Sequence, residues 1–339
     1  MTNMDGKVVL VTGASAGVGR ATARAFARAG AKVGLLARES EGLEETRREL
    51  LVLGAEAEVF PADVADAEAV FAAAEACRDR LGPIDIWVNN AMTTIIGKLG
   101  QVSPEEFRRV TEVTYLGYVH GTMAALRQME PRDAGVIVQV GSALAYRGIP
   151  LQSAYCGAKH AIRGFSDALR TELIHSQSRI RITSVHLPAV NTTQFDWART
   201  KREAQPRPVA PVYSPQAAAD AIVHAAMNPK REYWLGRSTA MTILGAMALP
   251  SFMDRYLARN TVEGQDRDEP VEPDREDNLR SPVEDLHEPD GAFDDEARAH
   301  AVLLPASVTL ATLAGGTLLV AGLAGAALAK VFGTARGRH

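Results

Sequence analysis

The chain has 339 residues, 46% of them hydrophobic, which is enough for one large domain with a sizeable core. A formal net charge of −4 argues against a nucleic-acid partner, because such proteins usually carry an excess of positive charge. The two cysteines, Cys77 and Cys156, lie in no metal-ligand spacing, so we expect no metal site and a reducing, cytoplasmic setting. We also expect no secretory signal, because the first residues lead directly into an apolar, strand-like run.

Short apolar runs alternate with helix-like segments over residues 1–260, which we predict to form one domain. The predicted strands are 7–12, 32–37, 58–60, 84–89, 136–140, 181–187 and 233–235. The clearest amphipathic segments between them are the predicted helices 66–81, 105–129 and 154–176. Apolar strands that alternate with helices are typical of a parallel sheet covered on both faces. We therefore predict an α/β fold with a doubly wound, Rossmann-like parallel sheet.

The first predicted strand ends in a glycine-rich stretch, TGASAGVG, at residues 12–19, and a predicted helix follows at 20–29. Glycines accept positive φ angles and let a phosphate approach the backbone, while the start of the helix offers unpaired N–H groups. A dinucleotide pyrophosphate fits such a corner. Any tight turn between a strand and a helix favours glycine, but the position in the first strand–helix unit favours dinucleotide binding.

The second predicted strand ends in the stretch LLARES, with Ala37 at its end and Arg38 next. An acidic residue at this strand end would bond the 2′-hydroxyl of the adenosine ribose and select NAD. The guanidinium of Arg38 instead suits a 2′-phosphate, although an ordinary solvated surface charge is the alternative. We therefore predict a preference for NADP(H) over NAD(H).

Three candidate catalytic side chains lie in the middle of the chain. Ser142 follows the fifth predicted strand, and Tyr155 and Lys159 form a YxxxK motif shortly after it. The tyrosine and the lysine are one helical turn apart, so both project from the same helix face. A nearby ammonium lowers the pKa of a phenol, which lets Tyr155 exchange a proton with a carbonyl or an alcohol. An ordinary core tyrosine is the alternative for Tyr155 taken alone.

The TGxxxGxG motif, the NNA stretch at 89–91, Ser142 and the YxxxK motif occur in one characteristic order. In this, residues 5–240 resemble the short-chain dehydrogenase/reductase family, in its single-domain branch. The resemblance implies hydride transfer between a nicotinamide cofactor and a carbonyl or secondary alcohol. It implies that Ser142 stabilises the substrate oxygen, that Tyr155 exchanges the proton and that Lys159 bonds the nicotinamide ribose. It also implies a homodimer or homotetramer paired through the two longest predicted helices.

Carried over residue by residue, the resemblance implies cofactor contacts along much of the chain. They are Thr12, Gly13, Ser15, Gly17, Val18, Gly19, Arg38, Asp63, Val64, Asn89, Ala91, Tyr155, Lys159, Pro188, Thr192 and Thr193. The stretch LPAVNTT at 187–193 lacks the glycine of the family's PGxxxT pattern. Either of its two threonines is therefore open as the contact to the nicotinamide amide or the phosphates.

A second departure from the family is Thr114, which stands in VTYLG at 113–117 where an asparagine is usual. In the family this position bends the helix and presents a main-chain carbonyl to a water that relays protons to the lysine. A threonine keeps the carbonyl and can bond back into its own helix, so Thr114 remains a catalytic candidate. If the relay has failed, the alternative function is a catalytically weak nucleotide-binding sensor or scaffold at the membrane.

The substrate end is predicted from apolar residues alone. Trp197, Trp234 and the segment 241–252 lie where the family builds its variable substrate lid. Their character predicts an apolar pocket and a lipophilic carbonyl or alcohol as the small-molecule substrate.

The last part of the chain differs in composition from the rest. Residues 261–300 carry fifteen acidic residues against four arginines, so we expect a disordered acidic linker. Residues 301–332 form a hydrophobic segment, and its uncharged part at 306–329 is long enough to cross a membrane once as a helix. A buried core helix and an oligomerisation element are the alternatives. A basic tail at 333–339 ends the chain.

We expect the catalytic domain to lie in the cytoplasm, anchored to the membrane by this C-terminal helix, because NADP(H) is a cytoplasmic cofactor. The basic residues Lys330, Arg336 and Arg338 argue against a single crossing, since positive charge favours the inner side. A shallow insertion that turns back at Gly315 and Gly316 is the alternative topology.

Overall fold

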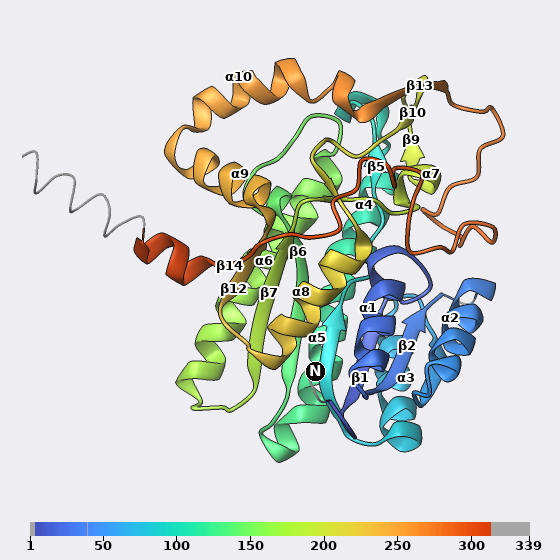
Figure 1. Ribbon diagram of the computed structural model, residues 1–339, viewed down its shortest axis with the longest axis vertical. Helices are drawn as coiled ribbons and strands as arrows, with labels where there is room; N and C mark the ends of the chain where they lie inside the picture. Colours follow the sequence, from blue (N-terminus) through green and yellow to red (C-terminus); the bar gives the residue numbers. More distant parts are fainter. Residues whose placement is uncertain (1–3, 39, 313–339) are drawn as a thin grey trace, which may run out of the picture.

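The computed structural model describes residues 4–38 and 40–312 and is built around one eight-stranded sheet (Figure 1). The strand order is β14-β12-β7-β6-β4-β1-β2-β3, and every neighbouring pair is parallel except β14 with β12. The strands are β1 Val8–Thr12, β2 Lys32–Ala37, β3 Ala57–Pro61, β4 Ile84–Asn89, β6 Val136–Ser142, β7 Arg181–Leu187, β12 Glu232–Leu235 and β14 Leu303–Pro305. The predicted Rossmann-like parallel sheet is therefore confirmed.

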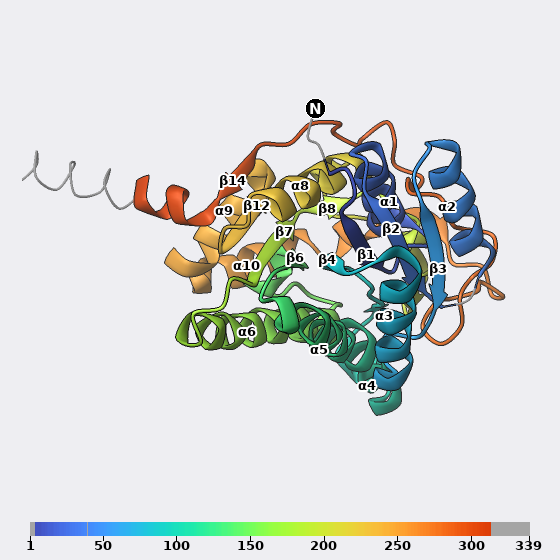
Figure 2. The same ribbon diagram turned by 90° about the horizontal axis from the view of Figure 1, so that it is seen from below.

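Helices cover both faces of this sheet (Figure 2). One layer holds α1 (Gly17–Arg28), α2 (Glu41–Val52) and α8 (Pro215–Met227). The other holds α3 (Ala67–Leu81), α4 (Pro104–Thr111), α5 (Gly117–Met129) and α6 (Ser153–His175). Because both faces are covered, β1 is buried along its whole length, and two apolar clusters form the core on either side.

The sequence predicted one long helix over 105–129, but the structure divides it. A π-helical turn at Glu112–Leu116 separates α4 from α5. The capping box between Ser103 and Glu106 begins α4 as its sequence dictates. The π-helical turn is a single-turn irregularity of the kind that often marks a functional position in a helix.

Small elements lie above the carboxyl ends of the sheet strands (Figure 1). Three two-stranded pairs are β5 (Ile95–Ile96) with β9 (Arg199–Thr200), β8 (Ala189–Val190) with β11 (Val212–Tyr213), and β10 (Ala204–Pro206) with β13 (Asp266–Pro270). Three helices accompany them: α7 (Gln194–Trp197), α9 (Gly236–Ala248) and α10 (Pro250–Asn260). These elements surround the crevice in which α/β sheets bind ligands.

The acidic segment 261–300 is ordered and packed, which corrects the expectation of a disordered linker. Its strand β13 pairs with β10, and Leu279, Val283 and Phe293 are buried. Arginines within the segment bind to the domain: Arg275 donates to the carbonyls of Phe195 and Ala198. The composition of the segment predicted disorder wrongly, because a few well-spaced apolar side chains suffice to hold an otherwise polar segment onto an existing surface.

The predicted membrane segment falls mostly on residues that the structure does not describe. Within residues 4–38 and 40–312, no helix is both long enough and apolar enough to cross a membrane. The predicted crossing at 306–329 beyond position 312, and the basic tail at 333–339, lie outside the described residues.

Candidate active site

A cavity of about 370 Å³ opens at the carboxyl ends of β1, β2, β4, β6 and β7. Most of the residues expected from the sequence line it: Gly13, Ser15, Gly17, Val18, Gly19, Arg38, Asp63, Val64, Ala91, Ser142, Tyr155, Lys159, Pro188 and Thr192. The cavity lies where open parallel sheets bind ligands, at the point where strand order reverses beside β1. The structure thus brings the glycine-rich corner and the three catalytic candidates into one cleft.

The glycine-rich corner between β1 and α1 is folded as its sequence requires. Gly13 and Gly17 have positive φ angles of 65° and 54°. At Gly19, a Cβ atom would lie 1.9 Å from the carbonyl oxygen of Gly13, so no side chain fits there. At the start of α1, the amide of Arg20 makes a hydrogen bond to the carbonyl of Ala16. Val18 and Gly19 come before it, and amides this early in a helix have no partner within the helix. The corner therefore fits a phosphate group of a dinucleotide.

Thr12 fixes this corner to the end of β4 without lining the cavity. Its Oγ1 donates to the carbonyl of Val88 and accepts from the amides of Asn90 and Ala91, at 3.2, 2.9 and 3.1 Å. The side chain of Asn90 returns a bond to the carbonyl of Thr12 at 3.0 Å. Asn90 also lines the cavity, although the cofactor contacts predicted from the sequence were its neighbours Asn89 and Ala91.

Asn89 faces away from the cavity, contrary to its expected cofactor contact. Its amide lies fully buried among Trp87, Thr122 and Gln139, with bonds of 2.8, 3.0 and 3.0 Å. Gly121 of α5 packs against it, since a Cβ there would lie 2.2 Å from the Asn89 oxygen. Asn89 is the last residue of β4, and alternate side chains of a strand point to opposite faces of the sheet.

Ser142 and Tyr155 meet at the inner end of the cavity. Ser142 ends β6, and its Oγ accepts a bond from the amide of Leu144 at 3.1 Å. Burial raises the pKa of Tyr155, and a hydrogen bond with the Ser142 side chain only partly opposes this rise. The phenol is therefore protonated at neutral pH and can donate to the oxygen of a bound carbonyl.

Lys159 lies one turn further along α6 and is 2% exposed. Its Nζ donates to the carbonyl of Val140 at 2.8 Å and to the hydroxyl of Tyr118 at 2.9 Å, and lies 5.6 Å from the centre of the Tyr155 ring. Burial lowers the pKa of Lys159 to about 7. The expected lowering of the Tyr155 pKa by a nearby ammonium is therefore not found, because burial raises the pKa of the phenol and lowers that of the lysine.

Thr114 stands in the π-helical turn and does not line the cavity. Its Oγ1 donates to the carbonyl of Thr93 at 2.8 Å and accepts from the amide of Thr93 at 3.0 Å. The side chain thereby ties the helix to the loop that follows β4. Tyr118, one turn later, stands in no motif that would have predicted it, although it contacts Lys159 directly.

A buried network supports the backbone of Ser142 from behind. The Nδ1 atom of His186 lies 3.1 Å from the Ser142 carbonyl oxygen, and its Nε2 lies 3.0 Å from a Glu232 carboxylate oxygen. Tyr146 donates to the same carboxylate at 2.6 Å. Burial of Glu232 opposes ionisation, but the bonds from His186 and Tyr146 lower its pKa to about 2. Nothing in the sequence patterns indicated this network.

Charged side chains define the end of the cavity beyond β2. The Nη2 atom of Arg38 donates to the carbonyl of Asn278 at 2.9 Å. Its Nη1 is buried and has no hydrogen-bond partner among the described residues. Asp63 forms an ion pair with Arg109, whose Nε donates to the carbonyl of Leu279 at 3.0 Å. Arg109 and the segment near 278 were not anticipated from the sequence.

The structure distinguishes the two threonines of the LPAVNTT stretch. Thr192 lines the cavity, whereas Thr193 is buried behind it and its Oγ1 lies 3.5 Å from the carbonyl oxygen of Glu288. Gly17 packs against Thr192, since a Cβ there would lie 3.3 Å from the threonine side chain. Of the two alternatives, Thr192 has the geometry for a cofactor contact.

The remaining wall of the cavity is largely apolar. It includes Leu144, Ile149, Phe195, Trp197, Val209 and Leu257. Trp234 is not part of it, because the indole is fully buried between β12 and α9 with Ile243 and Ala240. From the predicted lid segment 241–252, Thr242 reaches the cavity.

Comparison with known proteins agrees with this geometry. The profile of the short chain dehydrogenase family matches residues 7–204. The oxidoreductase YxnA of Bacillus subtilis (strain 168) is 34% identical over 279 residues, covering 81% of this chain and 78% of its own. A fatty acyl-CoA reductase of Acinetobacter baylyi is 34% identical over 244 residues, which cover 71% of this chain and 80% of the reductase. An alcohol dehydrogenase from the archaeon Thermococcus sibiricus has a similar crystal structure, determined in complex with 5-hydroxy-NADP. The two chains are 29% identical with a TM-score of 0.58, and the match covers 68% of this chain and 95% of the dehydrogenase.

Proposed function

We propose that this chain, which belongs to the short-chain dehydrogenase/reductase family of oxidoreductases, uses NADP(H) to interconvert a carbonyl and a secondary alcohol on a lipophilic substrate. The observation that carries the proposal is the convergence of Ser142, Tyr155 and Lys159 on one cavity with the glycine-rich corner. The glycine-rich corner fits a nicotinamide dinucleotide. Its tight turn, in which a Cβ at Gly19 would lie 1.9 Å from the Gly13 carbonyl oxygen, leads into the start of α1, where a phosphate can bind.

The residues have complementary roles in the reduction direction. The nicotinamide cofactor, when bound, supplies the hydride that adds to the carbonyl carbon. Tyr155, kept protonated by burial, gives its proton to the carbonyl oxygen, and Ser142 stabilises the negative charge that develops there. Lys159, whose Nζ donates to the Tyr118 hydroxyl, would bond the nicotinamide ribose. The product is the alcohol, and the reverse steps oxidise it.

The preference for NADP(H) rests on the end of β2. Ala37 leaves no carboxylate there to bind a ribose 2′-hydroxyl, and Arg38 has a buried Nη1 with no partner among the described residues. A buried guanidinium N–H without a partner is a donor whose hydrogen bond a phosphate oxygen would accept. The relative from Thermococcus sibiricus, crystallised with an NADP derivative, supports the same choice.

The substrate class follows from the apolar wall of the cavity. Aliphatic and aromatic side chains near Ser142 favour a substrate whose carbonyl is attached to an apolar group. The relative named as a fatty acyl-CoA reductase is consistent with a long-chain substrate.

Turnover by the full chain tests the proposal. NADPH oxidation is measured with a panel of long-chain aldehydes, lipophilic ketones and quinones, for wild type and for Tyr155→Phe. We expect turnover by the wild type, and a loss of at least a hundredfold in Tyr155→Phe with NADPH binding retained, since general acid catalysis contributes about 10²–10⁴-fold. Equal rates for the two proteins would refute the role of Tyr155. NADPH binding without turnover of any substrate would instead favour the sensor or scaffold.

Assembly and location are separate proposals that rest on the sequence and the family. We propose a homodimer or homotetramer paired through α5 and α6, which sedimentation at micromolar concentration tests. We also propose that residues 306–329 anchor the chain in the membrane with the catalytic domain in the cytoplasm. Release of the protein by a carbonate wash would contradict the anchor.

A further inference from the structure

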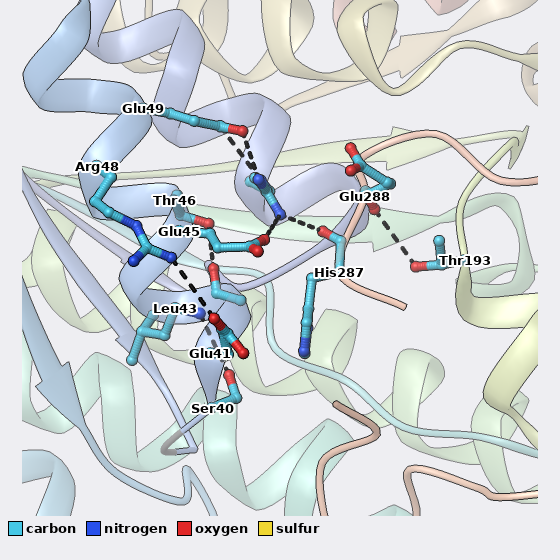
Figure 3. Close-up of polar contacts among 12 residues, drawn as sticks. Ser40, Glu41, Leu43, Glu45, Thr46, Arg48, Glu49, Thr193, His287 and Glu288 are labelled. Carbon is cyan, nitrogen blue, oxygen red and sulfur yellow. Dashed lines mark hydrogen bonds and ion pairs between the residues drawn. The ribbon is translucent and has the colours of Figure 1, made fainter. Parts of the chain in front are cut away.

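Residues 278–293, here called the acidic strap, run across the open side of the cavity. Their main-chain carbonyls accept hydrogen bonds from the residues beneath. Asn278 accepts from Arg38 at 2.9 Å. His287 accepts from Arg20 at 2.8 Å, and this bond is the dashed line that ends on the main-chain oxygen of His287 in Figure 3. The amide of Gly17 donates to the carbonyl of Glu288 at 3.1 Å. A segment from the far end of the chain therefore covers the glycine-rich corner.

Apolar anchors hold the acidic strap near both ends. Leu279 is fully buried in a cluster with Ile95 and Val110. Phe293 packs edge-to-face on Phe195, with ring centres 6.5 Å apart. These two anchors restrict the covering segment to one position rather than many.

The acidic strap forms a wall of the cavity and leaves space beneath it. Pro282, Val283 and His287 line the cavity, as do Ser15 and Val18 of the glycine-rich corner. The carboxylates of the strap, such as Glu288 and Asp290, are exposed. A dinucleotide in this cavity would lie between the strap and the sheet.

Two polar residues of the strap, Asn278 and His287, line this space, and of the two His287 lacks hydrogen-bond partners for its side chain among the described residues. His287 is 7% exposed, and neither ring nitrogen has a hydrogen-bond partner among the described residues. Glu284 is its nearest acidic neighbour, at 3.8 Å from Nε2. The ring packs over Gly42 in the first turn of α2, where a Cβ would lie 2.1 Å from it. Buried nitrogens without partners cost free energy unless a ligand satisfies them.

We propose that the acidic strap roofs the adenosine half of the dinucleotide cleft, and that His287 is a further ligand of the 2′-phosphate. The inference rests on the proposed function. His287 from the strap and Arg38 from the end of β2 both line the cavity, and both have buried nitrogens without partners among the described residues. An imidazole N–H and a guanidinium N–H are both donors that phosphate oxygens accept. The strap thereby selects NADP(H) and encloses it.

Equilibrium binding of the full chain tests the role of His287. Dissociation constants for NADPH and NADH are measured by cofactor fluorescence for wild type, His287→Ala and His300→Ala. His300 is an exposed histidine further along the chain and serves as the matched control. We expect His287→Ala to weaken NADPH binding about tenfold, the worth of one hydrogen bond to a charged group, and to change NADH binding less than twofold. His300→Ala is expected to bind both cofactors as the wild type does.

A second variant tests the roof independently of His287. Phe293→Ala removes one anchor of the strap without altering a residue that lines the cavity. We expect NADPH to leave this variant several times faster than the wild type in stopped-flow displacement. Tighter NADPH binding would show that the strap competes with the cofactor. An unchanged rate of release would show that the strap does not cover the cofactor. Either result would overturn the proposal that the strap roofs the cleft.

The outcomes also separate this inference from the proposed function. If the wild type binds NADPH and His287→Ala binds it equally well, the assignment of His287 is wrong while the proposed function stands. An equal loss for NADPH and NADH likewise overturns the 2′-phosphate contact. If the wild type binds neither cofactor, the proposed function itself fails.

Discussion

Burial of Lys159 makes the stability of this protein depend on pH in a direction that can be measured. The pKa of Lys159 falls from an ordinary value of 10.5 to about 7 in the folded chain because the ammonium is buried. Between these two values the unfolded chain holds the proton more tightly than the folded chain. The folded state therefore carries a penalty that is full below pH 7 and is relieved as the pH rises toward 10.5.

The size of this effect follows from the two pKa values. Linkage gives a penalty of about 4 kcal/mol at pH 7 and about 2 kcal/mol at pH 9, relative to a lysine whose pKa does not change on folding. The wild type should therefore gain about 2 kcal/mol of stability over this range from Lys159 alone. A variant with an uncharged side chain at this position has no such dependence.

Urea unfolding of the cofactor-free protein at pH 7 and pH 9 measures this gain. The wild type is compared with Lys159→Met, which keeps most of the length of the side chain and loses the ammonium. Other groups also titrate, such as Cys77, whose pKa burial raises to about 12, but they contribute equally to both proteins. Only the difference between the two pH dependences reports on Lys159. If the two proteins change in parallel between pH 7 and pH 9, the buried-ammonium argument is wrong.

Two further predictions concern the cofactor cleft. Arg38→Ala should weaken NADPH binding by about 1–3 kcal/mol through loss of a charge-assisted contact and leave NADH binding nearly unchanged; calorimetric titration with each cofactor checks this, and equal losses would refute the assignment. Gly19→Ala should abolish binding of both cofactors, because its Cβ would lie 1.9 Å from the Gly13 carbonyl oxygen. A Gly19→Ala protein that unfolds like the wild type yet binds NADPH normally would contradict this view of the corner.

The sequence predicted the part of the site that depends on local motifs. The glycine-rich corner, Ser142, Tyr155 and Lys159 line one cavity because each is tied to the end of a strand or to one helix face. Asn89 shows the limit of such reasoning. Its motif is local, but which side its amide faces is decided by Thr122 and Gln139, which come from other elements.

Interactions between distant segments account for what the sequence did not predict. The network of His186 and Glu232 joins β7 to β12, and neither residue stands in a recognisable pattern. The segment 261–300, which contains the acidic strap, was expected to be disordered because its charge is high and its apolar residues are few. Its order depends on surfaces formed far earlier in the chain, as in the bond from the Asn191 side chain to the carbonyl of Gly291, 100 residues later.

Strand β14 has a consequence for how copies of the molecule can associate. A parallel sheet ending at β12 would present a row of free amides and carbonyls to which another chain could add. The antiparallel strand β14 occupies that row, is three residues long and ends at Pro305, which has no amide to donate. The opposite outer strand, β3, likewise ends at a proline, Pro61. Growth of the sheet from one copy into the next is therefore disfavoured at both sides, which favours the helical faces for any symmetric pairing.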